Sequence, residues 1–343
     1  MEARVRDAVR HACGREPLRV EWLAGALGTR RFARAVLDGP GPRSVVARIE
    51  AEEDPAGRPA GAAPEPPLEP LRSVLEAHGL PVARRFGSAP CIELLEDLGD
   101  VTLEATLRLA SAERRTSLYR EVLGQIPRLQ AIADPGLPAF GRRLDAELYA
   151  YKGRLFAEWS LPLALGRPAR PGETKVVDEA FAWISDALAP APHRLAHRDL
   201  QSRNLLLHAR QGEPPRLFWI DLQGAFLAPP EYDAVCLLRD SYVELAAGEI
   251  EALGAELRPA LPDNPDPLSF ARRFDLLTLT RKGKDHARFV YAARTRGETA
   301  YLAHLPATAR HLKHAARAAA SRDPELARLA ELVLALPEAP CAP

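Results

Sequence analysis

The sequence carries no net charge and almost no lysine, and both features limit what the protein can bind. Its 343 residues include 46 lysines and arginines and 46 aspartates and glutamates. A nucleic acid or an anionic membrane attracts proteins with a strong positive charge, which this chain lacks. We therefore expect neither as a partner. The basic residues are almost all arginine, and the lysines are Lys152, Lys175, Lys282, Lys284 and Lys313.

Cysteine and long apolar runs are also scarce. The four cysteines, Cys13, Cys91, Cys236 and Cys341, form no C-x-x-C pair and no cysteine–histidine pattern typical of a zinc site. No stretch approaches the roughly 18 apolar residues that a membrane-spanning helix needs, and the charged N-terminus lacks the apolar core of a secretion signal. We expect a cytoplasmic monomer with reduced thiols.

The first hundred residues have the pattern of a small antiparallel sheet. A short helix is predicted over residues 3–12, and three apolar runs alternate with turn residues between positions 18 and 50. A second helical pattern ends at Gly79, and two more apolar stretches follow it. Segment 54–70 is rich in proline, glycine and alanine, which predicts a surface loop. We assign residues 1–99 to a nucleotide-binding N-lobe.

The remainder of the chain, residues 100–343, is predicted to be a mainly helical C-lobe. Its apolar residues recur at three- and four-residue spacing. Only segment 194–223 breaks this pattern, because two short apolar runs, NLLLH and RLFWID, flank the turn-rich ARQGEPP. This arrangement predicts a β-hairpin, so the fold class is α+β.

The hairpin carries the most informative motif of the chain, HRDLQSRN. Asn204 opens the first predicted strand and Asp221 closes the second, so antiparallel pairing brings them to one end of the hairpin. Asp199 lies in the loop that enters this end. Two carboxylates and an amide oxygen suit Mg²⁺, which binds few protein ligands together with substrate phosphates.

This geometry predicts a phosphotransferase centre. Phosphoryl transfer needs a carboxylate that orients the attacking hydroxyl, and we assign that role of catalytic base to Asp199. Asn204 and Asp221 are the predicted Mg²⁺ ligands. Aspartate and asparagine are also common turn formers, which would explain an isolated H-x-D. The asparagine at the matching offset and the strand–hairpin–strand context favour catalysis.

A kinase that uses ATP needs a loop over the phosphates in its first lobe. The segment LAGALGTRRFAR offers Gly25, Gly28 and Thr29 between two strand-like runs, where backbone amides can approach phosphates closely. An ordinary hairpin turn has the same pattern. The position of the segment ahead of the H-x-D motif favours phosphate binding.

Two other features of the N-lobe concern the nucleotide. Protein kinases hold phosphates with a lysine on the third strand, but this N-lobe has no lysine. Arg48, in SVVARIE, occupies the equivalent place, although an exposed strand arginine would look the same. Its helix partner would be Glu69 or Glu76. In CIELLEDLGD we predict the interlobe hinge, where backbone from Glu96 to Leu98 meets adenine; its acidic residues also suit a helix cap.

Several longer stretches carry a family resemblance in order over most of the chain. They are GTRRFAR, ELLEDLGDVTL, ELYAYKGRLFAEWSL, HRDLQSRNLL, WIDLQGAFLAPPEYDAVCLLRDSYVEL and FARRFDLLTLTRKGK. Together they resemble the aminoglycoside phosphotransferase-like kinases, and most closely the anomeric kinases of N-acetylmuramate and N-acetylglucosamine in peptidoglycan recycling. The resemblance implies a bilobal protein-kinase-like fold, ATP and Mg²⁺ as cosubstrates, and phosphate transfer to the 1-hydroxyl of an amino sugar.

The same resemblance places sugar recognition in the helical lobe. Its candidates are polar or aromatic residues of the matching stretches: Glu158, Trp159, Gln201, Arg203, Gln223, Arg239 and Asp240. Trp159 equally suits the core, and Arg239 equally suits an ion pair with Asp233. Lys282 and Lys284 suit a sugar carboxylate or a phosphate, although a solvated helix face is the simpler expectation.

Two other functions stay open at this point. A related kinase would act on an aminoglycoside, an amino alcohol or a different sugar, and an enzyme for polycations would carry an acidic patch. Segments 140–165 and 232–300 mix both signs of charge instead. A nucleotide-binding pseudokinase would fit the missing lysine, but the intact Asp199, Asn204 and Asp221 argue against it.

Overall fold

The chain divides into two compact units in the computed structural model, which describes residues 1–23, 30–50 and 66–338. Unit 1 comprises the described residues before position 66, Arg72–Val101 and Leu206–Ile220. Unit 2 comprises Pro66–Leu71, Thr102–Leu205 and the described residues from Asp221 onward. The strands of the predicted hairpin are thus grouped with unit 1, whereas the residues at its base belong to unit 2.

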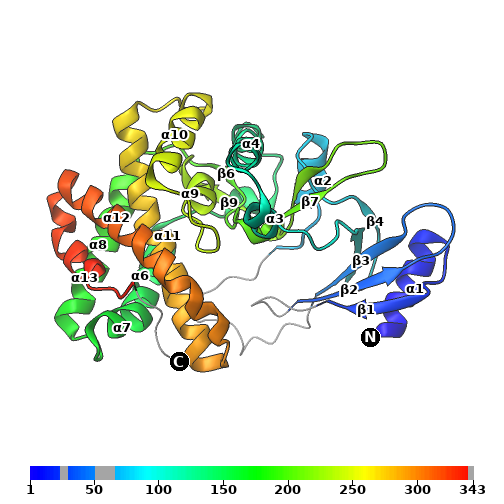
Figure 1. Cartoon of the computed structure of the whole chain (residues 1–343), viewed down its shortest axis with the longest axis horizontal. Helices are drawn as coiled ribbons and strands as arrows, with labels where there is room; N and C mark the ends of the chain where they lie inside the picture. The colour runs from blue at the N-terminus through cyan, green and yellow to red at the C-terminus, as the bar shows by residue number, and fades with distance from the viewer. Residues whose placement is uncertain (24–29, 51–65, 339–343) are drawn as a thin grey trace. The chain divides into compact units, whose positions relative to one another are not determined.

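Unit 1 contains a five-stranded antiparallel sheet in the order β1-β2-β3-β5-β4. Its strands are β1 (Arg19–Trp22), β2 (Arg31–Val36), β3 (Ser44–Ile49), β4 (Arg85–Ala89) and β5 (Ile92–Glu96). Helix α1 (Glu2–Cys13) packs on one face of this sheet (Figure 1). The strands alternate apolar and polar residues, so one face is buried against the helix and the other is left for polar groups.

Helix α1 illustrates how local sequence sets these contacts. Val5, Ala8 and Val9 recur at helical spacing and are buried in the core beneath the sheet. The helix ends at Gly14, whose φ of 64° is left-handed and whose N–H donates to the carbonyl of Arg10 at 2.9 Å. Glycine adopts this backbone conformation at little cost, so the helix stops here.

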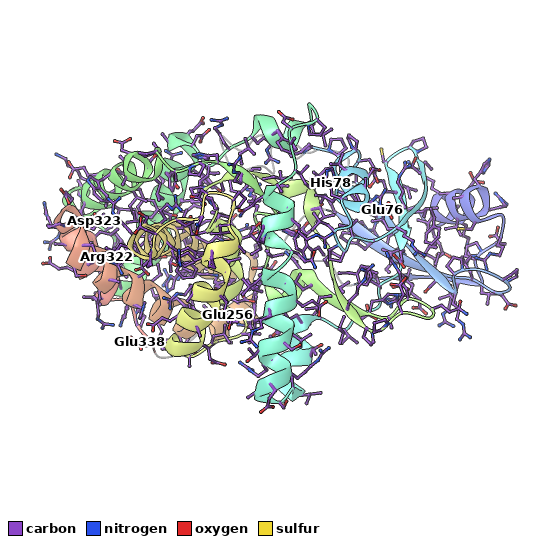
Figure 2. The ribbon with its side chains drawn as sticks, turned by 90° about the horizontal axis from the view of Figure 1, so that it is seen from above. Glu76, His78, Glu256, Arg322, Asp323 and Glu338 are labelled. Atoms are coloured by element: carbon purple, nitrogen blue, oxygen red, sulfur yellow. The ribbon has the colours of Figure 1, made fainter. Side chains whose placement is uncertain are left out.

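Two further elements complete unit 1. The predicted hairpin is present as β7 (Leu205–His208) and β8 (Arg216–Trp219), and Phe218 packs with Ala83 and Leu98. Helix α2 (Leu71–Ala77) carries Glu76 near its C-terminal end, and His78 follows it (Figure 2).

Unit 2 is built from helices and one short sheet. Strands β6 (Arg194–Ala196) and β9 (Phe226–Ala228) pair antiparallel. Its helices are α3 (Leu103–Leu109), α4 (Ala112–Leu123), α5 (Ile126–Gln130), α6 (Ala146–Leu155), α7 (Leu161–Leu165), α8 (Pro171–Leu188), α9 (Tyr232–Leu238), α10 (Ala247–Leu257), α11 (Pro267–Arg296), α12 (Leu305–Arg322) and α13 (Ala327–Leu334). A π-helix, η3 (Phe156–Ser160), joins α6 to α7.

The 30-residue helix α11 is the central element of unit 2 and packs against α6, α8, α9 and α12 (Figure 1). Asp266 caps its N-terminus by accepting the N–H groups of the next turn. Arg322 and Asp323 lie side by side at the end of α12 (Figure 2) and form ion pairs with Asp275 and Arg272 of α11 at 2.7 and 2.9 Å. These ion pairs connect α11 to the end of α12.

Among the helices that the structure describes, none combines the length and the low charge needed to cross a bilayer. The antiparallel sheet and the mainly helical remainder confirm the predicted α+β class.

Candidate active site

The HRDLQSRN segment runs from β6 to β7 and is held by two buried carboxylates. Asp233, in the first turn of α9, accepts the backbone N–H groups of His197 at 2.7 Å and Arg198 at 3.0 Å. Asp240, just beyond α9, accepts the backbone N–H of Ser202 at 2.8 Å. Three backbone donors of the loop are therefore satisfied by carboxylates in and just beyond α9, which constrains the conformation of the loop.

Burial raises the pKa of Asp233 and of Asp240, because an apolar environment disfavours the charged carboxylate. The backbone N–H bonds oppose this rise in both cases. Both side chains are fully buried. Their role is to position the loop, and the sequence-based suggestion that Asp233 pairs with Arg239 is wrong, since the two are not ion-paired.

Backbone strain is present on both sides of the hairpin. Arg198 has a φ of 80° and Asp221 a φ of 63°, both in the left-handed region that β-carbon-bearing residues rarely adopt. Such conformations cost about 1–3 kcal/mol and persist only where the surroundings enforce them, typically at functional sites. At Arg198 the enforcing contact is the hydrogen bond to Asp233.

Asp199, the predicted base, points at α11. Its Oδ1 accepts a hydrogen bond from Arg281 Nη2 at 2.7 Å, and its side chain is 29% exposed, whereas that of Arg281 is 2% exposed. Burial alone would raise the pKa of Asp199, but Arg281, Lys284 and Arg198 outweigh it and hold that pKa well below its ordinary value. The carboxylate is thus anionic, and its side chain is partly exposed.

Asn204 and Asp221 lie at the base of the hairpin, as predicted. The Asn204 side-chain nitrogen donates to the carbonyl of Asp199 at 2.8 Å, which directs its side-chain oxygen elsewhere. Asp221 follows β8 and accepts a hydrogen bond from the side chain of Gln223 through one oxygen. One amide oxygen and one carboxylate are therefore presented as oxygen ligands.

This donor set suits Mg²⁺ better than a metal that is bound by protein ligands alone. No group of three or more histidine, cysteine or carboxylate side chains is arranged for a metal in the part of the chain that the structure describes. Mg²⁺ commonly takes one or two protein ligands and completes its octahedral shell with water and substrate phosphates. The residues present fit that pattern.

The predicted nucleotide residues are described only in part. Gly25, Gly28 and Thr29 lie outside the described residues. Arg48 is not an exposed strand arginine as the alternative supposed, because it is only 4% exposed on β3. Its Nη1 pairs with Glu50 at 2.5 Å and lies 3.5 Å from Glu93 on β5.

Neither Glu69 nor Glu76, the two predicted helix partners of Arg48, makes these contacts with it. Glu76 pairs instead with Arg72 at 2.7 Å within α2, and β5 supplies the cross-strand carboxylate to Arg48. The second nitrogen of the guanidinium, Nη2, is buried with no hydrogen-bond partner among the described residues. An unpaired buried donor of this kind is costly, so a ligand at this point would satisfy it.

The predicted hinge is the end of β5. The carboxylate of Glu96 pairs with Arg210 at 2.5 Å and accepts the backbone N–H of Arg84 at 3.0 Å. Burial opposes ionisation, but these partners lower the pKa of Glu96. The side chain of Leu98 is buried, and its backbone N–H donates to no described group. The side chains therefore stabilise unit 1, and a backbone donor remains at Leu98.

The sugar candidates Glu158 and Trp159 lie in the π-helix η3, a kind of turn that is frequent at functional sites. Glu158 is exposed. Trp159 is half-buried and packs edge-on against Tyr291 of α11, with ring centroids 5.0 Å apart. It belongs to an aromatic cluster formed by Trp159, Tyr242, Phe289, Tyr291, Tyr301 and His304.

Arg203 joins the catalytic loop to this aromatic cluster. It pairs with Glu104 at 2.6 Å, lies over the ring of Tyr242 at 3.8 Å and approaches His304 at 3.2 Å. Its neighbour Gln201 is half-buried, and the backbone N–H of Gln201 donates to the carbonyl of Asp199 at 2.8 Å.

The remaining sugar candidates are buried and engaged inside the protein. Gln223 is 3% exposed and contacts Asp221, and Asp240 holds the loop at Ser202. Arg239 lies with its guanidinium 5.6 Å from the ring of Phe274, and burial lowers its pKa. The structure brings Gln201, Arg203 and Gln223 to the catalytic segment and places Arg239 away from it.

Sequence reasoning missed the charges of α11. Lys282 and Lys284 are not on a solvated face: Lys282 is fully buried and the side chain of Lys284 is 14% exposed. Asp285 accepts contacts from Arg281, Lys282 and Lys284 at 3.0, 3.1 and 3.2 Å. The available signal was the segment FDLLTLTRKGKDHARFV, where charges interrupt apolar residues on every side of a helix and so cannot all reach solvent.

A family model and several curated proteins match this chain. A model of the phosphotransferase enzyme family matches residues 27–270. N-Acetylmuramate/N-acetylglucosamine kinase of Pseudomonas aeruginosa is 30% identical over 255 residues, which cover 71% of this chain and 70% of the relative. The enzyme of the same name from Neisseria meningitidis is 29% identical over 247 residues, covering 70% and 71%.

Two solved structures share the fold. ADP-bound aminoglycoside phosphotransferase APH(2'')-Ib has a TM-score of 0.53 at 12% identity, with 91% of this chain and 97% of that chain covered. Choline kinase from Cryptosporidium parvum has a TM-score of 0.57 at 12% identity, with 92% and 93% covered. These likenesses confirm the kinase-like fold that the sequence predicted.

Proposed function

The chain belongs to the phosphotransferase enzyme family, and from this premise we propose that it transfers the γ-phosphate of ATP to the anomeric 1-hydroxyl of an amino sugar. The acceptor is N-acetylmuramate, N-acetylglucosamine or a related hexose, as the names of its curated relatives suggest. Such a reaction would serve the recycling of cell-wall sugars.

The observation that carries this proposal is the state of Asp199. Its carboxylate is held by Arg281 and is kept anionic, and its side chain is partly exposed. A carboxylate with a low pKa is a weak base, so it orients the sugar hydroxyl and takes the proton only as the new bond to phosphorus forms. Positioning of the acceptor is therefore its main contribution.

ATP and Mg²⁺ are the proposed cosubstrates. Asn204 and Asp221 would hold the metal, which when bound neutralises charge on the phosphates. Arg48 would contact a phosphate through its unpaired Nη2, and the N–H of Leu98 would donate to adenine. We assign Gly25, Gly28 and Thr29 to the phosphates on sequence grounds.

One experiment tests the proposal directly. The purified protein is incubated with ATP, Mg²⁺ and a panel that contains both N-acetylated sugars, other hexoses, an aminoglycoside and choline. Phosphorus NMR then locates the new phosphate. We expect an anomeric phosphate on an amino sugar, which is acid-labile; phosphate on a 6-hydroxyl or on the aminoglycoside would disprove the assignment.

Two of the alternative acceptors, aminoglycosides and amino alcohols, are cationic, and the charge of unit 2 argues against them. Asp199 is surrounded by Arg198, Arg281, Lys284 and Arg288, which all lower its pKa. A polycation or a quaternary amine would be repelled at the position that its hydroxyl must reach. A neutral or anionic acceptor avoids this repulsion.

A further inference from the structure

Several positive charges lie around Asp199, and three of them converge on one carboxylate. Three of them, Arg281, Lys282 and Lys284, share the single carboxylate of Asp285. Asp199 adds a second carboxylate, which contacts Arg281, and the charge of Lys282 also lowers the pKa of the buried Asp240. Buried charges are normally paired one to one, so this arrangement is unusual for a purely structural network.

Two further basic residues have no carboxylate partner among the described residues. Arg288 is exposed on α11 and makes no ion pair or hydrogen bond there, yet its charge acts on Asp199 and Lys284. Lys152 of α6 is 2% exposed. Among the described residues, its Nζ contacts the hydroxyl of Tyr232 at 3.4 Å and lies over two aromatic rings. Burial lowers the pKa of Lys152.

Three of these basic residues lie along one face of α11. Arg281, Lys284 and Arg288 are separated by three and four residues, so their side chains follow one side of the helix over about 10 Å. We call these three residues the basic face. Its first member contacts the base, Asp199, and its last member is exposed.

The basic face also approaches the aromatic cluster. Arg288 acts electrostatically on Tyr301, a member of that cluster, as well as on Asp199. Aromatic rings pack against the apolar faces of sugars, and Trp159 and Tyr291 of the cluster are partly exposed. An acceptor whose hydroxyl lies at Asp199 would therefore have Lys284 and Arg288 beside its ring.

We propose that the basic face of α11 binds a carboxylate attached to the acceptor sugar, so that the enzyme prefers an acidic amino sugar to its neutral counterpart. This inference rests on the proposed sugar-kinase function and specifies its substrate class. Arg288 is the principal contact, because a guanidinium binds a carboxylate through two parallel hydrogen bonds. Lys284 adds charge from one turn earlier, and Asp199 remains the base.

The test compares two sugars that differ in this group: N-acetylmuramate, which bears a carboxylate, and N-acetylglucosamine, which is neutral. Values of kcat/KM for both are measured with wild-type enzyme and with Arg288→Gln. We expect the variant to lose roughly ten- to a hundredfold with the acidic sugar, as befits a charge-assisted hydrogen bond, and less than about threefold with the neutral one.

Two matched variants control for structural effects. Arg294→Gln removes an exposed arginine from the last turns of the same helix and should leave both sugars unaffected. Arg288→Lys retains the charge but lacks the planar guanidinium that forms two parallel hydrogen bonds. It should therefore be more active with the acidic sugar than Arg288→Gln. A thermal melt of each variant verifies that the fold is retained.

The other outcomes overturn the inference in distinguishable ways. Equal loss with both sugars, together with a higher KM for ATP, would assign the basic face to the nucleotide phosphates. An unchanged ratio between the sugars would show that the carboxylate is not bound there. Turnover of neither sugar by the wild-type enzyme would instead contradict the proposed function itself.

Discussion

Arg48 in unit 1 and Arg281 in unit 2 are both buried arginines next to residues of the candidate site, but their charges are balanced differently. Arg48 lies between two carboxylates, Glu50 and Glu93. Arg281 contacts Asp199 and Asp285, and it shares Asp285 with Lys282 and Lys284. A balanced charge is stable without a ligand, whereas a surplus of cations favours binding of an anion. The comparison supports our proposal that the acceptor binds in unit 2.

The largest effect is expected when Asp199, the carboxylate that contacts Arg281 in unit 2, is substituted. Asp199→Asn keeps the size of the side chain but removes the charge that orients the acceptor hydroxyl. We expect kcat to fall by roughly 10²- to 10⁴-fold, the usual contribution of a positioned base. Binding of ATP, measured by calorimetry, should stay near normal.

Asp186→Asn, an exposed position on α8, is the control and should retain full activity. If Asp199→Asn turned over at the wild-type rate, its assignment as the base would be wrong. A lower melting temperature for this variant is expected as well, because Arg281 and Lys284 lose a compensating charge.

The second effect concerns the metal. Asp221→Asn removes a charged ligand, so the Mg²⁺ concentration that gives half-maximal nucleotide binding should rise by about tenfold or more. A Mg²⁺ titration at fixed ATP measures this shift. Glu213→Gln, exposed in the hairpin loop, should not change it. An identical Mg²⁺ requirement in both variants would count against Asp221 as a ligand.

The third effect is a pH dependence of acceptor selection. Burial, together with the charge of Arg281, lowers the pKa of Lys284 to about 8. Since lysine is cationic below its pKa, Lys284 is charged at pH 7 and loses its charge as the pH rises through about 8. The charged groups that act on it are Arg281, Asp285 and Arg288 on α11 and Asp199 on the loop, and the charge of Lys284 in turn lowers the pKa of the buried Lys152 on α6.

We therefore expect kcat/KM for N-acetylmuramate to fall above pH 8 relative to that for N-acetylglucosamine. Lys284→Arg should remove this relative decline, because arginine stays protonated throughout the range. Parallel pH profiles of the two sugars in wild-type enzyme would show that Lys284 does not select the acceptor.

The smallest effect is expected at Arg48, where the charge is already balanced. Arg48→Met should raise the KM for ATP severalfold and leave kcat nearly unchanged, because only the unpaired Nη2 would contact a phosphate. Arg19→Met, an exposed arginine of β1, serves as the comparison. A wild-type KM in the Arg48 variant would make its role purely structural.

Local patterns allowed the sheet, the hairpin and the positions of Asn204 and Asp221 to be predicted. Each depends on residues within about 20 positions, where alternation and turn chemistry are informative. The prediction of a helix glutamate as the partner of Arg48 was wrong. The actual neighbour depends on the register between β3 and β5, which places Arg48 opposite Glu93. Sequence spacing alone does not fix that register.

The environment of Asp199 could also not be predicted from local sequence patterns. Arg281 lies 82 residues away from it in the chain, and only the packing of α11 against the catalytic segment brings them together. The same holds for Asp233, whose hydrogen bonds to the loop span 35 and 36 residues. Such contacts depend on the tertiary fold.

Helix α11 carries the contact to the base at Arg281 and an aromatic contact at Tyr291 on one continuous rod. Their axial separation is ten residues, or about 15 Å, and ion pairs to α12 hold the beginning of the rod. A loop-borne site can adjust to new ligands by changing loop length. Here a broader acceptor range must come from substitutions of side chains on the helix, which identifies those positions as the first targets for engineering.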